Sequence, residues 1–445
     1  MKHRSPIRFV GTFGLICIVT VADWSNPAHA QVPGDLIRQP ADTISQQVEE
    51  RVENRVEQSV SQRLNQQVEE QLSTTAKAAR KLRDRLAVRT SSGKVAFHQV
   101  SLPNGDIAVE RQWLFTGTAE EIARLRQSDI RIIQRQSLES LGLTVVRFEV
   151  PDNLDSRDAL ARLLPDAADR LDRNHVYRPQ AGAGPSSPNN PEPNPAGTCP
   201  MPTPVGMVDT GVEVDHPMLK GVQVEQRQFL EEDGDTLAEP RKHGTEVAGI
   251  LATHLSAEAS SDARLFSASV FHGQDNRSDG ATLGHLLQGL NWLASQPVRV
   301  INISLTGPDN RILETAIQAL EKRGILLVAA VGNAGPSAPP LYPAAYPGVI
   351  GVTAIDRDDR LYRWANRGNQ VMFAARGVNI RVADPGGGQS VQSGTSLAAP
   401  VVSAMLACEQ TGQSPDTAVQ LLKNRARDLG PPGRDPGYGY GAVGP

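Results

Sequence analysis

Three separated segments of the chain carry side chains suited to nucleophilic catalysis. A hydroxyl stands at Ser396, an imidazole at His243 and a carboxylate at Asp209. Attack on a carbonyl near neutral pH needs a nucleophile stronger than water, a base that takes its proton and donors for the oxyanion that forms. Because each requirement has a candidate, we expect these side chains to meet at one site.

Asp209 ends the apolar segment 205–208 and is followed by Thr210 and Gly211. A carboxylate at the end of a strand can accept a hydrogen bond from one imidazole nitrogen, which fixes the tautomer and stabilises the imidazolium that forms during reaction. By itself, Asp-Thr-Gly also suits half of an aspartic peptidase site or a simple turn.

His243 opens a helical pattern whose apolar positions include Val247, Ile250 and Leu251. The next residue, Gly244, lets another part of the chain approach closely. A histidine in the first turn of such a helix is suited to a surface cleft, although a lone histidine is only a candidate for catalysis.

Ser396 lies where a stretch of small residues leads into a helical pattern that continues to Cys408. A backbone N–H at the start of a helix can donate to an oxyanion, although a serine there also serves as an ordinary cap. Asn333 follows the apolar segment 326–330. Its amide could supply a second oxyanion donor, or Asn333 could simply suit the turn.

From residue 204 onward, segments typical of buried strands alternate with helical patterns. These segments are 205–208, 247–255, 265–270, 283–294, 300–305, 312–322, 326–330 and 349–354. The alternation predicts an α/β fold with a mainly parallel, doubly wound sheet. In such a sheet, chemistry gathers at the carboxyl ends of the strands, where the candidate residues fall.

Taken together, these motifs resemble those of subtilisin-family serine peptidases. The matching motifs are Asp209-Thr210-Gly211, His243-Gly244-Thr245, Ser304-Leu305-Thr306-Gly307, Ala329-Ala330-Val331-Gly332-Asn333 and Gly394-Thr395-Ser396-Leu397-Ala398-Ala399-Pro400. They occur in the order known for that family. The resemblance covers residues 204–445 and implies a subtilisin-like domain that hydrolyses peptide bonds through an acyl-enzyme.

The resemblance also implies a role for individual residues. Asp209, His243 and Ser396 match the catalytic triad, and Asn333 matches the side-chain donor of the oxyanion hole.

Residues Ser304, Leu305, Thr306 and Gly307 match the strand that pairs with the substrate backbone, and residues 277–280 match the opposite edge. Recognition of main chain implies broad specificity toward protein or peptide substrates. Leu341 stands where relatives often have Gly at the bottom of the pocket for the residue before the cut. A bulky side chain there favours small or medium apolar residues.

Two alternatives compete with an active peptidase. The first is a catalytically silent subtilisin-like module used for binding or assembly, although all four catalytic positions are filled. The second is an acid-acting relative with Glu in place of the histidine and Asp in place of the oxyanion asparagine. His243 and Asn333 argue against this second alternative.

The first residues of the chain have the pattern of an export signal. Basic Lys2, Arg4 and Arg8 precede an apolar run, and residues 28–30 read Ala-His-Ala. Such a pattern predicts a signal peptide over 1–30 and a periplasmic or extracellular protein, with an uncleaved anchor as the alternative. Removal of the signal leaves Cys199 and Cys408, which either form a disulfide or leave Cys408 as an inert buried thiol.

Between residues 43 and 90 the sequence predicts a long polar helix or coiled coil. Valine and leucine recur at every fourth position from Val48 to Val68, among Gln, Glu, Arg and Asn. This spacing exceeds the 3.6 residues of a helical turn, so the apolar line drifts around the helix. The segment either serves self-association or forms a solvated stalk.

Residues 94–180 form a small α/β unit with a β-α-β-β-α-β order, which is typical of a ferredoxin-like fold. Its order is similar to that of the inhibitory pro-domains of subtilisin-family peptidases. The resemblance implies that residues 175–179 lie in or near the active site, with cleavage between Tyr177 and Cys199. Residues 181–203 are rich in Pro, Gly, Ser and Asn and are predicted to be a linker.

Bulk composition narrows the remaining function classes. A length of 445 residues favours several folding units. A net charge of −4 gives no broad basic surface, which argues against nucleic acid as a partner. His243 and His254 lack the glutamate-linked pattern of a zinc site, and no acidic loop has calcium-ligand spacing. The sequence therefore predicts no metal and no cofactor.

Overall fold

The structure is a computed structural model that describes residues 63, 66, 85–125, 129–179, 203–255, 263–274, 277–410 and 412–444. The chain divides into two compact units, residues 1–77 and 78–445. The second unit holds almost all of the described residues and contains two folded parts, residues 85–179 and 203–444. The predicted signal peptide, most of the predicted helix 43–90 and most of the linker 181–203 lie outside the described residues.

The prediction that the helix continues to residue 90 is wrong, because β1 (Arg85–Arg89) is a strand. It pairs antiparallel with β2 (Val95–Ser101), and Val88 lies directly opposite Phe97. Both side chains are buried with Leu230 and Leu237, which are more than a hundred residues away in the sequence. Burial against this distant partner explains why residues 85–89 form a strand.

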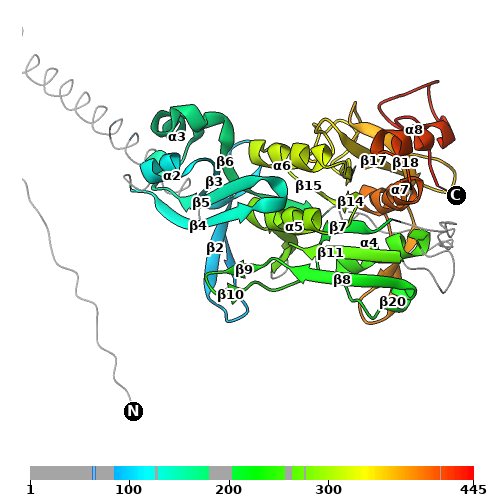
Figure 1. Ribbon diagram of the computed structural model, residues 1–445, viewed down its shortest axis with the longest axis horizontal. Coiled ribbons are helices and arrows are strands. Elements are labelled where there is room, and N and C mark those ends of the chain that lie inside the picture. The colour runs from blue at the N-terminus through cyan, green and yellow to red at the C-terminus, as the bar shows by residue number, and fades with distance from the viewer. Residues whose placement is uncertain are drawn as a thin grey trace, which may run out of the picture. The chain divides into compact units, whose positions relative to one another are not determined.

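A seven-stranded parallel sheet forms the centre of the C-terminal part, residues 203–444 (Figure 1). This confirms the predicted parallel α/β fold. The strand order is β18-β17-β16-β14-β7-β11-β8. Their bounds are Val371–Arg376, Val349–Ile355, Leu326–Ala330, Val300–Ile303, Val205–Asp209, Ala263–Ser269 and Val222–Gln228. Strands β7 and β14 are buried at every residue, as expected for inner strands of a parallel sheet covered on both faces.

Helices cover both faces of this sheet. On one face lie α5 (Leu283–Ser295) and α6 (Arg311–Lys322), whose buried side chains form one apolar cluster. On the other lie α4 (Lys242–Leu255), α7 (Thr395–Glu409) and α8 (Pro415–Arg425), which contribute to a second cluster. Helix α7 is buried along most of its length, as expected for a helix that is apolar on all sides.

Short strands complete the C-terminal part. Four of them form two antiparallel hairpins. One hairpin joins β9 (Glu231–Glu232) to β10 (Asp235–Thr236), and the other joins β19 (Ile380–Asp384) to β20 (Gly388–Gln392). Three more lie near the carboxyl edge, namely β12 (His272–Gln274), β13 (Arg277–Thr282) and β15 (Leu305–Thr306). None of these hairpins was predicted, because two-residue to five-residue strands carry too little periodicity to be recognised.

The N-terminal part, residues 85–179, is an antiparallel half-barrel. Its strands are β1, β2, β3 (Ile107–Thr116), β4 (Arg131–Leu138), β5 (Leu143–Glu149) and β6 (Leu171–Pro179). Helix α2 (Ala119–Leu125) lies between β3 and β4, and α3 (Arg157–Leu163) lies between β5 and β6. The elements from β3 to β6 follow the predicted β-α-β-β-α-β order. The hairpin of β1 and β2 precedes them and was not predicted, so a ferredoxin-like description does not cover the whole part.

The predicted capping box opens α2 in the structure. Thr118 N donates to Glu121 Oε2 at 2.8 Å, and Glu121 N donates to Thr118 Oγ1 at 3.4 Å. Arg170 donates to the same carboxylate and holds the pKa of Glu121 at about 2. Because the N-terminal part has its own apolar cluster of buried residues, it folds around a core separate from the parallel sheet.

Cys408, near the end of α7, is disulfide-bonded, so the alternative of an inert thiol is wrong. Its partner lies outside the described residues. Thr203 N and Oγ1 both donate to Ala407 O, at 3.3 and 3.0 Å, which brings the chain just after Cys199 beside Cys408. Pairing with Cys199 stays a prediction that these contacts support.

In the part of the chain that the structure describes, no helix has both the length and the apolar composition needed to cross a membrane.

Candidate active site

Asp209 and His243 form a buried hydrogen-bonded pair at the carboxyl edge of the parallel sheet. Asp209 is the last residue of β7 and is 0% exposed. His243 Nδ1 donates to Asp209 Oδ1 at 2.7 Å, and the backbone N–H of Thr210 donates to the same oxygen at 2.7 Å. Since an ionised carboxylate only accepts, the proton of the neutral ring lies on Nδ1. The other nitrogen, Nε2, is thereby an acceptor.

Gly244 lets α4 approach β7 closely enough for this pair to form. Its N–H donates to Thr210 Oγ1 at 2.7 Å. A Cβ at residue 244 would lie 2.4 Å from Thr210 O and 2.6 Å from Gly211 O, so a larger residue would push the helix away from the strand. Glycine at this position therefore sets the distance between His243 and Asp209.

Ser396 lies in the first turn of α7 and is 0% exposed. Ser304 Oγ donates to the carbonyl oxygen of Ser396 at 2.9 Å. Asn302 on β14 links this contact to the helix, because its Nδ2 donates to Ser304 Oγ at 2.8 Å and its Oδ1 accepts from Ser403 Oγ at 3.0 Å. This buried network fixes the start of α7 against the end of β14.

The starts of α4 and α7 share the carboxyl edge of the sheet. Gly394 N donates to Gly377 O, and Gly377 N donates to Ile355 O at the end of β17. Helices α4 and α7 pack against each other on the same face of the sheet. Among the described residues, none hydrogen-bonds His243 Nε2, so the predicted contact with the Ser396 hydroxyl is not formed in this state of the chain. Such contacts often tighten only when substrate binds.

Asn333 is oriented by the start of α7. Its Oδ1 accepts from Thr395 N at 3.1 Å and from Thr395 Oγ1 at 2.9 Å. Since the amide oxygen faces Thr395, its nitrogen is directed away from that residue, as an oxyanion donor next to Ser396 requires. Leu341 lies in the same region, because its Cδ1 would be 2.7 Å from a Cβ at Gly332.

The predicted substrate strand, residues Ser304 to Gly307, contacts β6 of the N-terminal part. Strand β15 pairs antiparallel with β6, with Leu305 opposite Pro179 and Thr306 opposite Arg178. On its other side β6 pairs with β13, with Ala281 opposite Tyr177. The strand β6 therefore lies between the two edges that were predicted to hold substrate.

The side chain of Tyr177 fills the space beside Gly307. A Cβ at Gly307 would lie 2.3 Å from Tyr177 Cδ1, and Tyr177 Oη donates to Pro308 O at 3.3 Å. The ring is fully buried, which raises the pKa of its hydroxyl well above the usual value. The N-terminal part thus inserts a large aromatic side chain next to the predicted substrate strand.

Charges near His243 determine its protonation. Burial lowers the pKa of His243, but the charge of Asp209 and its hydrogen bond raise it, and Glu246 and Asp279 raise it further. The net shift is upward. Sequence reasoning did not single out these last two acids. Glu246 follows His243 by three residues, a helical spacing that could have drawn attention to it.

Both additional acids have raised pKa values. Burial raises the pKa of Glu246, against the opposing charges of His243 and Lys242. Burial also raises the pKa of Asp279 to about 6, with His243 lowering it and Asp209 raising it. Perturbed acids gathered around one histidine are typical of a functional cleft.

Metal ligands do not cluster in the described part of the chain, where no group of three or more His, Cys, Asp or Glu side chains could hold an ion.

The model of the subtilase family (peptidase S8) matches residues 203–441, which is more than half of the chain. This chain belongs to the subtilase family. Its members are serine endopeptidases, which agrees with the family suggested by the motifs.

Two curated relatives illustrate the range of similarity. The minor extracellular protease Epr of Bacillus subtilis is 34% identical over 209 residues, covering 45% of this chain and 32% of Epr. Subtilisin BL of Lederbergia lenta is 31% identical over 237 residues, covering 51% of this chain and 84% of that protein. Because the chain spans only about a third of the length of Epr, the activity, substrates and partners of this subtilase are proposals.

The fold similarity extends beyond the residues that match the family. Fervidolysin from Fervidobacterium pennivorans, a keratinolytic enzyme related to subtilisin, superposes with a TM-score of 0.60 at 19% identity. The match covers 81% of this subtilase and 63% of fervidolysin. Since the family model covers little more than half of the chain, the shared fold includes residues N-terminal to 203.

Substitution of Gly244 by Ala is expected to lower kcat/KM about a hundredfold, because an error near 1 Å in the position of a catalytic group has an effect of that size. The added methyl would meet two backbone oxygens and displace His243 from Asp209. The measurement is steady-state hydrolysis of a peptide by the purified mature enzyme, together with its Tm.

Gly388→Ala is the matched control, since the nearest atom to its Cβ is 3.9 Å away. Equal activity of the two variants would contradict the proposed positioning role of Gly244.

The acid limb of kcat/KM is expected above pH 6.5. A general base must be neutral, so activity rises as the pH passes through the pKa of His243, which is raised above 6.5. Release of β6 would weaken the burial that lowers this pKa and leave the hydrogen bond with Asp209 in place. A pH profile of kcat/KM for the mature enzyme from pH 5 to 9 measures this limb. A midpoint below pH 6.5 would contradict the prediction, because it would show that burial lowers the pKa of His243 more than Asp209 raises it.

Proposed function

We propose that this subtilase is a serine endopeptidase in which Ser396 is the nucleophile, His243 the general base and Asp209 the residue that orients the base. The observation that carries the proposal is the 2.7 Å hydrogen bond from His243 Nδ1 to Asp209 Oδ1. It leaves Nε2 as the ring nitrogen that can take a proton. It occurs at the sheet edge where α7 begins, with Ser396 in the first turn of that helix.

The proposed mechanism has two stages, in which Ser396 is first acylated by the substrate and the acyl-enzyme is then hydrolysed. Ser396 Oγ attacks the carbonyl carbon of the scissile bond and its proton passes to His243 Nε2, while Asp209 stabilises the imidazolium. The oxyanion accepts hydrogen bonds from the backbone N–H of Ser396 and from Asn333 Nδ2. Collapse of the intermediate breaks the C–N bond and the amine takes the proton from His243. Water, activated by the same ring, then hydrolyses the acyl-enzyme.

The N-terminal part is proposed to be a ferredoxin-like pro-domain that blocks the substrate cleft. Strand β6 supplies main-chain hydrogen bonds to both β13 and β15, the pairing that a substrate strand would make. In the stretch predicted to lie in the active site, residues 175–179, Tyr177 fills the space beside Gly307. Cleavage is proposed after Tyr177 and before Cys199, where the chain leaves β6.

Polar contacts fix the pro-domain on two helices of the C-terminal part. Asp172 Oδ2 accepts from the backbone N–H of Arg311 at the start of α6, at 3.1 Å. Asn174 Oδ1 accepts from the N–H of Gly284 at the start of α5, at 3.2 Å. Negative or accepting groups at helix N-termini satisfy N–H groups that have no partner within the helix. Strand β6 is thereby placed with respect to both helices.

A buried ion pair crosses the same interface. Arg147 of β5 donates with Nη2 to Glu232 Oε2 at 2.8 Å and with Nη1 to Glu232 Oε1, and both side chains are less than 10% exposed. His285 Nε2 lies 3.0 Å from Glu232 Oε1. Burial raises the pKa of Glu232, but the hydrogen bonds from His285 and Arg147 lower it to about 2.

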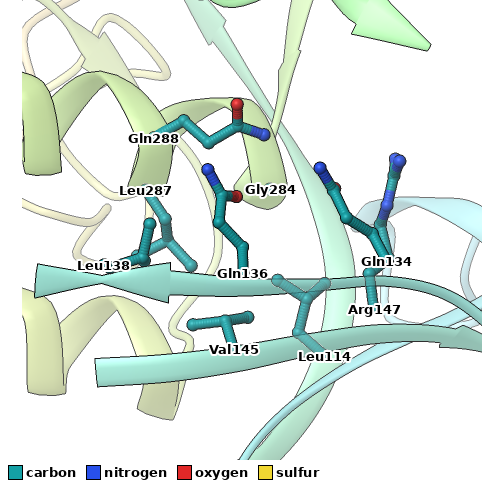
Figure 2. Close-up of a pocket in the computed structure, with 9 residues that line it drawn as sticks. All are labelled: Leu114, Gln134, Gln136, Leu138, Val145, Arg147, Gly284, Leu287 and Gln288. Atoms are coloured by element: carbon teal, nitrogen blue, oxygen red, sulfur yellow. The ribbon is translucent and has the colours of Figure 1, made fainter. Parts of the chain in front are cut away.

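The lining beside this pair is partly polar. Figure 2 shows a pocket between strands β4 and β5 and helix α5, lined by Leu138, Val145 and Leu287 together with Gln136 and Gln288. The two glutamines extend toward each other across it, from the pro-domain and from α5. An interface with glutamines and a charged pair is more polar than a protein core, which suits a pro-domain that must dissociate.

Substrate preference is proposed to be broad, because most recognition is by main chain. Leu341, packed against Gly332, is proposed to limit the pocket of the residue before the cut to small or medium apolar side chains.

Export to the periplasm or the extracellular space is proposed from the signal pattern at the start of the chain. Self-association through residues 43–90 is proposed from the apolar residues repeated in that segment.

Replacement of Ser396 by Ala is expected to lower kcat about a millionfold, the size of loss seen for this change in subtilisin. The variant should also fail to react with a fluorophosphonate probe and should keep residues 85–179 attached. The measurements are probe labelling, peptide hydrolysis and N-terminal sequencing of the secreted protein.

Ser337→Ala, which alters an exposed serine of the C-terminal part, is the control. Labelling of the Ser396→Ala variant, or loss of the N-terminal part from it at the wild-type rate, would contradict the proposed nucleophile or the proposed self-processing. A wild-type protein that neither labels nor hydrolyses peptides would be the silent module.

Substitution of Arg147 by Ala is expected to hasten release of the cleaved pro-domain at least tenfold. Removing one partner of a buried pair leaves the other charge uncompensated, which costs about 3 kcal/mol or more until that charge reaches water. The measurement is the delay between N-terminal cleavage, followed on a gel, and the appearance of full peptidase activity in the whole chain.

Arg131→Ala serves as the control, because Arg131 is 66% exposed and pairs with Glu149 within the pro-domain. An unchanged delay in the Arg147 variant would show that the buried pair does not hold the pro-domain in place.

A further inference from the structure

Strand β13 carries an acidic side chain into the cleft that the pro-domain fills. The register sets Ala281 opposite Tyr177 and Thr282 opposite Val176. Both strands continue beyond this point, β13 back to Arg277 and β6 on to Pro179. Since antiparallel partners run in opposite directions, the same register extended by two residues sets Asp279 opposite Pro179.

Directly opposite residues of an antiparallel pair share one face of the sheet, with Cβ atoms about 5 Å apart. Asp279 therefore lies on the same face as Pro179, and on the same face as Tyr177, whose ring fills the space beside Gly307. This face of β6 is the one turned into the enzyme. Leu305 lies opposite Pro179 from the other side, so the side chain of residue 179 lies between an acid and an apolar residue.

The charges of His243 and Asp209 both affect the pKa of Asp279, so its carboxylate lies within electrostatic range of that hydrogen-bonded pair. In the extended register, residue 179 is the position of β6 from which a side chain would meet this carboxylate. Pro179 has no charge, so the pro-domain offers Asp279 no counter-ion at this position. A substrate with a cationic side chain at the same position would provide a counter-ion for Asp279.

We propose that residue 179 marks the second position before the scissile bond and that Asp279 is a specificity-determining residue that favours Lys or Arg at this position. The inference rests on the proposed peptidase function and on β6 marking the path of a substrate. An extended substrate with Lys at that position would bring its ammonium group to the Asp279 carboxylate, in a cleft partly closed to water. Opposite charges that are partly desolvated attract more strongly than an exposed surface pair.

The test uses the mature enzyme released from the full chain and two peptide anilides that differ at one residue. Both have Ala next to the cut, and the second position is either Lys or norleucine, which has nearly the same shape without the charge. The wild-type enzyme is expected to show kcat/KM about tenfold higher for the Lys peptide, equivalent to about 1.4 kcal/mol. The ratio should fall toward one in Asp279→Asn and when the salt concentration is raised.

Asp279→Lys extends the test to a reversed charge. This variant should prefer a peptide with Glu at the second position over one with Lys. Asp416→Asn, which changes an exposed acid on α8, is the control and should keep the wild-type ratio.

Three outcomes overturn the inference. They are a wild-type ratio below about two, a ratio that persists in Asp279→Asn, and an equal loss for both peptides in Asp279→Asn, which would mark a structural role. If the wild-type enzyme cleaves neither peptide and does not react with a fluorophosphonate, the proposed function itself fails. Cleavage of the norleucine peptide without any preference for Lys leaves the peptidase intact and removes only the role of Asp279.

Discussion

The carboxylate of Asp209 is buried at the end of a strand, and a buried charge must be paired. It accepts hydrogen bonds from His243 and from the backbone of Thr210, both at 2.7 Å. An unpaired carboxylate at this depth would cost several kcal/mol or would take up a proton. The need to satisfy it explains why α4 must approach β7 so closely that only glycine fits at residue 244. The position and tautomer of the proposed base follow from that contact.

The start of α7 is fixed by a second set of buried polar groups. Asn302 links Ser304 and Ser403, while Asn333 accepts from Thr395, so β14, β16 and α7 are held at one edge. Polar networks of this kind are stable only when their members are satisfied. Here the network also fixes two residues that the proposed mechanism uses, Ser396 through Ser304 and Asn333 through Thr395. Stability of the core and geometry of the site therefore depend on the same contacts.

The N-terminal part shows how such a site is kept covered. Its strand β6 completes the hydrogen bonding of two strands that would otherwise offer unpaired backbone groups to any extended peptide. The remaining interface depends on helix-capping contacts and on the buried pair of Arg147 and Glu232. Charged and amide groups regain water when the two parts separate. Such an interface is compatible with both tight binding and later release.

The amino-acid sequence by itself determined the parallel sheet and the positions of the main residues of the site. Unbroken apolar strands such as residues 326–330 mark a sheet covered on both faces, and motifs with glycine close to Asp209, His243 and Ser396 mark its carboxyl edge. The nature of residues 85–89 was decided only in three dimensions, because Val88 is buried by residues far along the chain. The same holds for Glu232, Arg147 and Asp279, whose roles depend on partners from other segments. Local patterns report periodicity and turn chemistry, whereas pairing between distant side chains exists only after the chain has folded.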